Sequence, residues 1–298
     1  MYLFVVKSAN LLFPSSYVAV IIFDWDDTIC PSSFVDQYKV ESYNDLPLHC
    51  QNLFKEISRC AEKCLSMASK FGKVLLITNS DEGWVHYSAE RFLPHMLPVL
   101  NSGLYKIVSA RTRYEQYYPN QPLCWKAAAF AHEVNECYTS LKLAKQELQQ
   151  YYDDKVSTVS NNSFVSTDGT SNDEGEGVSS DEEDTIIPTG KFDDSGNHQI
   201  ISFGDSMEER TAVKIVAKQL DARYKSVMFL HCPTPEQIIG QLAMLISHMD
   251  NLCNSNDEYM DLEIGKNQAE RTAQRYLTVR KRAKAVSAEK RRIVNVRK

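Results

Sequence analysis

One segment near the start of the chain, VAVIIFDWDDT at residues 18–28, constrains the fold more than any other. A short run of β-branched and aromatic residues bounded by polar ones is typical of a buried strand in a parallel sheet. Such sheets bind ligands at the carboxyl ends of their strands. Asp24 and Asp26 follow this run directly, so we expect their carboxylates to share one crevice. Carboxylates so close repel each other, and a site that keeps both needs a divalent cation or a cationic side chain.

Two more segments repeat the pattern of a buried strand that ends in polar residues. KVLLITNS at 73–80 contains Thr78 near its end, and IISFGDSMEE at 200–209 carries Asp205 just past its apolar run. Between these segments, Lys126 opens a helical pattern, WKAAAF. The polar residues at three expected strand ends are therefore candidates for one site.

Strand-like and helix-like segments alternate along the chain, with further expected strands at 104–109 and 226–230. This alternation is typical of a parallel sheet with helices on both faces. We therefore expect an α/β fold, a Rossmann-like three-layer sandwich built on a five-stranded parallel sheet.

The four ordered motifs together resemble those of the haloacid dehalogenase (HAD) superfamily, in its phosphatase branch. The resemblance implies that Asp24 is the nucleophile and Asp26 the general acid and base. It implies that Thr78 and Lys126 hold the phosphoryl oxygens. It further implies a Mg²⁺ ion bound by Asp24, by the backbone carbonyl of Asp26 and by Asp205.

The last motif departs from the family pattern, which usually reads GDxxxD. Glu209 stands at the final acidic position here, and Glu208 is a competing candidate for a role near the metal. Ser206 and Glu209 also have the S-x-x-E spacing of a capping box, so an alternative interpretation is that Glu209 secures only a helix start.

The activity implied by the resemblance is Mg²⁺-dependent hydrolysis of phosphomonoesters through an aspartyl-phosphate intermediate. Asp26 favours phosphate chemistry, because the dehalogenases of the family lack an acid at that position. The chain has no room for a cap domain beside the motifs, and an open site suits a macromolecular substrate such as a phosphoprotein. Asn79, Arg111 and Arg113 are further candidates to bind the substrate, the two arginines from a tyrosine-containing loop.

Composition divides the chain into five expected parts. They are an N-terminal extension at 1–16, a core in two parts at 17–152 and 199–252, an acidic disordered insert at 153–198, and a basic C-terminal tail at 253–298. Usage of 43% hydrophobic and 24% charged residues is ordinary for a globular enzyme core.

Charge distinguishes the insert from the tail. Residues 168–198 contain ten acidic residues and one lysine. A segment with so much net charge has too little apolar surface to bury, so we expect it not to fold. Ser179 and Ser180 precede DEED, a context that suits an acidophilic kinase, although a plain solvated linker is the alternative. Residues 264–298 carry twelve Lys or Arg against two Glu, so this tail is a candidate to contact nucleic acid or an anionic surface, or to form a solvated basic helix.

Cysteine usage indicates the compartment. The eight cysteines form no CxxC pair, which favours reduced thiols and a cytoplasmic or nuclear location. The apolar first segment resembles a signal peptide, but its last third is the expected catalytic strand, so we expect neither secretion nor an integral membrane protein. The histidines are scattered, and we interpret each as structural.

Two other functions remain open at this level. The chain is alternatively a catalytically weak or inactive HAD-fold protein that holds partners with its charged segments. A third interpretation is a phosphatase for small metabolites that a partner subunit caps.

Overall fold

The computed structural model describes residues 18–160 and 198–296. The expected N-terminal extension and the serines Ser179 and Ser180 lie outside the described residues. The chain divides into two compact units, one of residues 1–139 with 197–298 and the other of residues 140–196.

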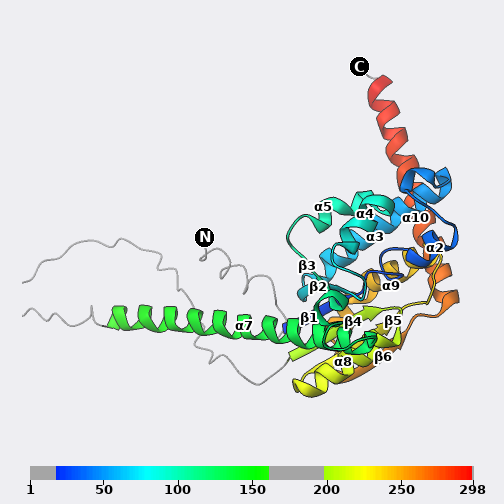
Figure 1. The fold of residues 1–298 in the computed structure, drawn as a ribbon. Coiled ribbons are helices and arrows are strands. Elements are labelled where there is room, and N and C mark those ends of the chain that lie inside the picture. The colour runs from blue at the N-terminus through cyan, green and yellow to red at the C-terminus, as the bar shows by residue number, and fades with distance from the viewer. Residues whose placement is uncertain (1–17, 161–197, 297–298) are drawn as a thin grey trace, which may run out of the picture. The chain divides into compact units, whose positions relative to one another are not determined.

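The first unit is built on a parallel sheet of six strands in the order β3-β2-β1-β4-β5-β6 (Figure 1). The strands are β1 (Val18–Phe23), β2 (Gly72–Thr78), β3 (Lys106–Ser109), β4 (His198–Gly204), β5 (Arg223–Met228) and β6 (Tyr259–Glu263).

Helices occupy the connections between the strands, and a last helix follows β6. They are α2 (Ser32–Gln37), α3 (Leu48–Ala68), α4 (Trp84–Phe92), α5 (Leu97–Leu100), α6 (Ala110–Tyr114), α7 (Pro122–Ser160), α8 (Met207–Gln219), α9 (Pro235–Asn254) and α10 (Lys266–Val296), with short 3-10 turns η1 (Tyr43–Asp45) and η2 (Pro94–Met96). Helix α7 continues to Ser160, past residue 152 where we expected the core to end, and its part from Ser140 belongs to the second unit.

The prediction of an α/β fold with a parallel sheet flanked by helices is confirmed, but the count of five strands is wrong. The missing strand is β6, whose sequence YMDLE pairs with β5 at the edge of the sheet. Its residues are mostly exposed, with Tyr259 at 64% and Leu262 at 43%. A short, charged edge strand lacks the continuous apolar run by which the central strands are identified.

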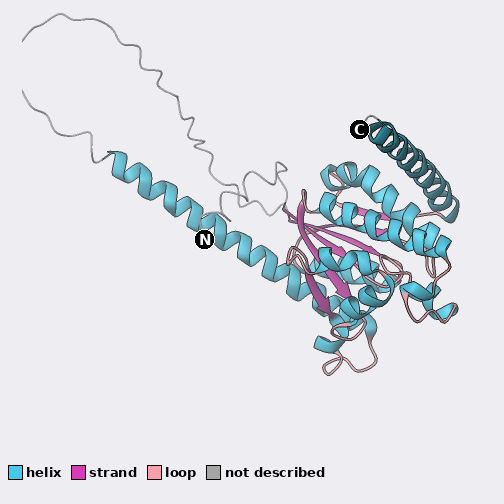
Figure 2. Ribbon diagram, turned by 90° about the horizontal axis from the view of Figure 1, so that it is seen from above, coloured by secondary structure: helices cyan, strands magenta, loops and turns pink. Residues whose placement is uncertain are grey.

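The central strands supply the core because both of their faces are covered. Residues 19–23 of β1 are each at most 2% exposed. Helices α3 and α9 pack together on one face of the sheet, and α8 packs against β4 and β5 on the other (Figures 1 and 2). Burial on both faces explains why β1 is apolar at every position rather than at alternate ones.

Helix α10 packs against α9 at a point of very close approach. A Cβ atom on Gly240 of α9 would lie 1.9 Å from the carbonyl oxygen of Ala269, so only glycine fits there. Further along α10, Arg280 and Lys284 form ion pairs of 3.2 and 2.8 Å with the buried Glu56 of α3. The range 253–298, which we expected to be a basic tail, thus contributes a strand and a packed helix to the first unit.

Candidate active site

The three strands that carry the expected site residues end side by side. Phe23 of β1 is in register with Leu76 of β2 and with Phe203 of β4. The backbone N–H of Asp24 continues this pairing by donating to the carbonyl of Phe203 at 2.9 Å. Asp24 and the polar residues that end β2 and β4 therefore meet at one edge of the sheet, as their positions in the sequence predict.

Lys126 at the start of α7 joins this edge. Its ammonium group lies 2.7 Å from Asp24 Oδ1 and 2.8 Å from Glu209 Oε1, and it donates to the carbonyl of Ile77 at 3.0 Å. The side chain is 1% exposed. Burial disfavours the charged form, but the two carboxylates outweigh burial, and the pKa of Lys126 is raised. Lys126 is therefore a fixed positive charge between two acids.

Asp205 completes a cluster of three carboxylates. One oxygen each from Asp24, Asp205 and Glu209 lies within 4.8 Å of the others. Burial raises the pKa of Asp24 well above its usual value despite the opposing effect of Lys126. Burial and the nearby Glu209 raise the pKa of Asp205 to about 6. For Glu209, the attraction of Lys126 outweighs burial and lowers the pKa.

The donor set of this cluster fits a hard divalent cation. Three carboxylates lie beside one ammonium group, and burial, with the repulsion of neighbouring carboxylates, raises the pKa values of Asp24 and Asp205. Oxygen ligands of this kind are those that Mg²⁺ and Ca²⁺ prefer, although such groups also cluster in proteins without a metal. The residues that would hold the ion are Asp24, Asp205 and Glu209.

Glu209 combines the two roles that the sequence left as alternatives. Its carboxylate accepts a hydrogen bond from the backbone N–H of Ser206 at 3.1 Å, which forms the capping box at the start of α8. Its other oxygen pairs with Lys126. Gly204 makes room for this side chain, because a Cβ atom there would lie 2.5 Å from Glu209 Cγ. Glu208 is half-exposed and is not part of the carboxylate cluster.

Asp26 lies apart from the ion-pair cluster, in a set of neutral donors. Its Oδ1 accepts hydrogen bonds from Ser32 Oγ at 2.5 Å and Trp84 Nε1 at 2.8 Å. Its Oδ2 accepts from Thr78 Oγ1 at 3.2 Å and Ser80 Oγ at 2.9 Å. Thr78 is thus placed at the site, where its hydroxyl contacts Asp26.

Asp27 anchors the loop that follows β1. It has a positive φ of 53°, and its carboxylate accepts hydrogen bonds from the backbone N–H and the hydroxyl of Ser33. These contacts tie the loop to the first turn of α2, which also carries Ser32. The loop conformation therefore fixes where Asp26 points.

The substrate-binding candidates do not join the carboxylate cluster. Asn79 donates to the carbonyl of Pro122 at 3.3 Å. Arg113 forms an ion pair of 2.7 Å with Glu133. Arg111 pairs with Glu115 at 3.0 Å and stands 5.8 Å from the centre of the Trp125 ring.

Sequence reasoning missed several residues at the site. His231, interpreted as structural, brings Nδ1 within 3.2 Å of Asp205 Oδ2 while its side chain is 79% exposed. Ser32, Ser80 and Trp84 contact Asp26 but stand outside the motif positions. Ser80 lies in the KVLLITNS segment, just past the end of a strand. That position is the sequence feature from which Ser80 could have been predicted as a site residue.

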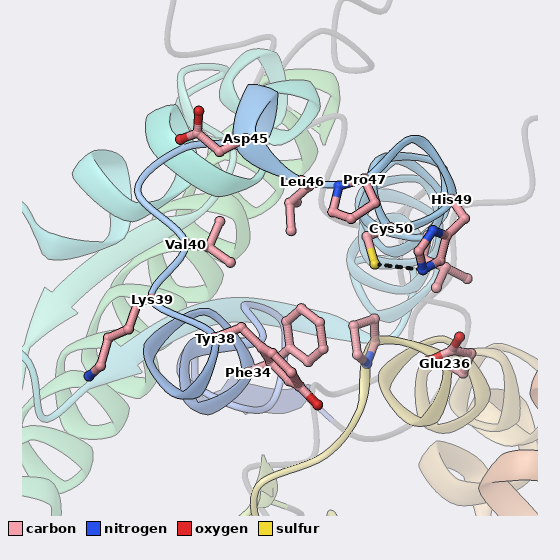
Figure 3. Close-up of a pocket in the computed structure, with 12 residues that line it drawn as sticks. Phe34, Tyr38, Lys39, Val40, Asp45, Leu46, Pro47, His49, Cys50 and Glu236 are labelled. Carbon is pink, nitrogen blue, oxygen red and sulfur yellow. Dashed lines mark hydrogen bonds between the residues drawn. The ribbon is translucent and has the colours of Figure 1, made fainter.

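A pocket of about 510 Å³ opens between α2, the start of α3 and the start of α9 (Figure 3). Phe34 and Tyr38 lie on one side, Leu46 and Pro47 face them, and Pro235 also belongs to the lining. Lys39, Asp45, His49 and Glu236 add charged and polar groups, and the rest of the lining is mostly apolar.

Comparisons of the chain with known protein families, with curated proteins and with solved structures found no match. Within residues 18–160 and 198–296, none of the helices combines the length and the apolar character needed to cross a membrane.

Proposed function

We propose that the protein is a Mg²⁺-dependent phosphomonoester hydrolase of the HAD type. The observation that carries the proposal is the buried contact of Lys126 with Asp24 beside Asp205 and Glu209. A nucleophile, a fixed cation and a set of oxygen ligands at one sheet edge are the parts that phosphoryl transfer needs.

Asp24 would attack phosphorus in line and form an aspartyl-phosphate, which divides one difficult displacement into two easier ones. Asp26 would protonate the leaving oxygen and then take a proton from the water that hydrolyses the intermediate. Lys126 would hold one phosphoryl oxygen. The hydroxyl of Thr78 would turn away from Asp26 and donate to a second phosphoryl oxygen.

Asp24, Asp205 and Glu209, with the backbone carbonyl of Asp26, are the groups that would hold Mg²⁺. A bound Mg²⁺ ion would offset the repulsion between an anionic nucleophile and an anionic substrate.

The connections around the site support a macromolecular substrate such as a phosphoprotein. The segment between β1 and β2 forms α2, η1 and α3, and the segment between β2 and β3 forms α4, η2 and α5. Neither segment forms a separate domain, so the site has no lid within the described residues of this unit. A large, folded substrate could then approach the sheet edge directly.

The test is hydrolysis of an aryl phosphate with and without Mg²⁺ by the wild type and by Asp24→Asn. We expect turnover that needs the metal and falls by at least about 10³-fold in Asp24→Asn, because an amide is a poor nucleophile. Asp36→Asn is the matched control, because it makes the same change at an exposed aspartate. Asp36 forms an ion pair with the exposed Lys39 and is not one of the candidate site residues. Wild-type protein that binds Mg²⁺ but turns over no phosphate ester would favour the interaction protein instead.

A further inference from the structure

The pocket of about 510 Å³ between α2, α3 and α9 takes no part in the phosphatase chemistry proposed above (Figure 3). Its volume lies within the range of about 300 to 1,000 Å³ that is usual for ligand pockets in proteins. Leu46, Cys50 and Pro235 in its lining are buried, whereas Tyr38 is 62% exposed, so an apolar floor is open to solvent. A hollow of this kind is a candidate to receive apolar groups from a ligand.

One wall of the pocket continues the loop that carries Asp26. Ser32 Oγ donates to Asp26 Oδ1 at 2.5 Å, and the backbone N–H of Ser33 donates to Asp27 at 2.9 Å. Phe34, the next residue of α2, lines the pocket. Because a helix rises by about 1.5 Å per residue, Phe34 lies only about 3 Å further along α2 than the serine that contacts Asp26.

A second wall continues the loop that follows β5. His231 in this loop brings Nδ1 within 3.2 Å of Asp205 Oδ2, and Pro235, four residues later, lines the pocket. The capping box of Thr234 and Gln237 fixes the start of α9 at this point. Both walls thus lead away from the carboxyl ends of the strands, where the candidate site lies, so the pocket adjoins that site.

We propose that this pocket is a specificity pocket for the substrate: it binds a bulky apolar side chain, such as phenylalanine or leucine, that lies a few residues from the phosphorylated residue of a protein. The proposal rests on the phosphatase function proposed above. An extended chain advances about 3.3 Å per residue, so a side chain two to five positions away reaches about 7 to 17 Å from the phosphate. This span covers a wall that begins within one helical turn of the contact with Asp26.

The lining selects an apolar group rather than a second phosphate. Lys39 on the rim already pairs with Asp36 at 3.3 Å. The rim also carries the carboxylates of Asp45 and Glu236, which repel a phosphate group or an acidic side chain. A phenylalanine or leucine that leaves water for this lining should gain at least about tenfold in affinity.

The first test uses phosphoserine peptides in the presence of Mg²⁺. One phenylalanine is moved through the positions two to five residues before and after the phosphoserine, and a peptide with serine in its place is the reference. We expect phenylalanine at one of these positions to raise kcat/KM about tenfold, through a lower KM, because the pocket binds it equally in the ground state and the transition state. Turnover without a preference above about twofold at any position overturns the pocket proposal and leaves the phosphatase proposal intact.

Two variants test whether the preference comes from this pocket. Tyr38→Ser removes an exposed part of the lining, and Val40→Asp places a carboxylate in it (Figure 3). Each should reduce the preference to less than about threefold, with turnover of the reference peptide unchanged. Tyr259→Ser is the matched control, because Tyr259 is 64% exposed but begins β6, at the amino ends of the strands. A preference that survives in both pocket variants overturns the proposal.

A binding measurement separates failure of the pocket from failure of the phosphatase proposal. Fluorescence anisotropy of the same labelled peptides on Asp24→Asn measures affinity without hydrolysis. We expect the phenylalanine peptide to bind about tenfold more tightly than the reference, and this difference to disappear when Tyr38→Ser is added.

The remaining outcomes are also decisive. Wild-type protein without turnover of any peptide overturns the phosphatase proposal, and equal binding of the two peptides then overturns the pocket proposal as well. Tighter binding of the phenylalanine peptide in the absence of turnover would support the pocket as a peptide-binding site. A dimer that Tyr38→Ser dissociates in sedimentation would place a second copy of the chain in the pocket and overturn the proposal.

Discussion

Lys126 contacts Asp24 at 2.7 Å although 102 residues separate them in the chain. The contact joins the first turn of α7 to the end of β1, and the same ammonium group reaches Glu209 at the start of α8. One buried cation therefore holds together three elements that the chain visits far apart. Removing that cation leaves two buried acids facing each other, which is costly.

Lys126→Met should abolish turnover and destabilise the fold. The methionine fills similar space but cannot offset Asp24 and Glu209, so we expect the free energy of unfolding to fall by about 3 kcal/mol and kcat by at least about 10²-fold. Urea titration and the aryl phosphate assay measure the two effects. Lys106→Met is the control, because Lys106 pairs with Glu133 and Glu136 away from the site and should leave kcat unchanged.

Gly204→Ala should weaken metal binding more than it weakens the fold. The added Cβ atom would lie 2.5 Å from Glu209 Cγ, so the glutamate must move away from Lys126 and from the carboxylate cluster. We expect Mg²⁺ affinity to fall about tenfold, as for the loss of a partner that orients a ligand, and calorimetric titration of Mg²⁺ measures it. Gly265→Ala, where the nearest atom would be 3.3 Å away, should bind Mg²⁺ as the wild type does. Equal affinity in Gly204→Ala would show that Glu209 is not a ligand.

Glu56 should make the attachment of α10 sensitive to acid. Burial opposes its ionisation, but Arg59 and Lys284, the latter from α10, lower its pKa to about 2. Because the pKa of glutamate in the unfolded chain is about 4.3, the contribution of Glu56 is complete well above that pH and is lost as the pH falls toward 2. The difference in the free energy of unfolding between wild type and Glu56→Gln should thus be constant near neutral pH, about 1 to 2 kcal/mol, and should shrink in acid. Urea titrations from pH 7 to 2.5 test it, and a constant difference would contradict the prediction.

The cost of burying the charge of Lys225 should disappear as the pH rises, so the free energy of unfolding should increase. It is fully buried on β5 and donates to the carbonyls of Leu252 and Ser255 at 2.5 and 2.9 Å, at the end of α9. Burial lowers its pKa to about 8. Since the pKa of lysine in the unfolded chain is about 10.4, the folded protein releases the proton first, and the cost of burying the charge disappears between about pH 8 and pH 10. The free energy of unfolding of the wild type should therefore rise relative to that of Lys225→Met across this range. A parallel pH dependence of the two proteins would refute the assignment.

The sequence by itself determined the class of fold and the edge of the sheet where the candidate site lies. An apolar run such as residues 18–23 can only be buried on both faces, and side chains that follow parallel strands meet at one edge because the strands run in the same direction. For this reason Asp24, Thr78 and Asp205 were identified from local sequence. Strand β6 was not predicted, because an exposed edge strand needs no apolar run.

Only the tertiary structure decided which donors surround each acid and where the basic C-terminal segment packs. Ser32 and Trp84 reach Asp26 because a loop with a left-handed residue and a helix start with a left-handed glycine aim them there, and neither geometry leaves a periodic pattern. Helix α10 docks on Gly240 of α9, the helix that precedes it, and on Glu56 of α3, which is more than 200 residues away in the chain. Contacts of this kind depend on the direction of side chains and on the packing of distant segments, so local sequence patterns do not predict them.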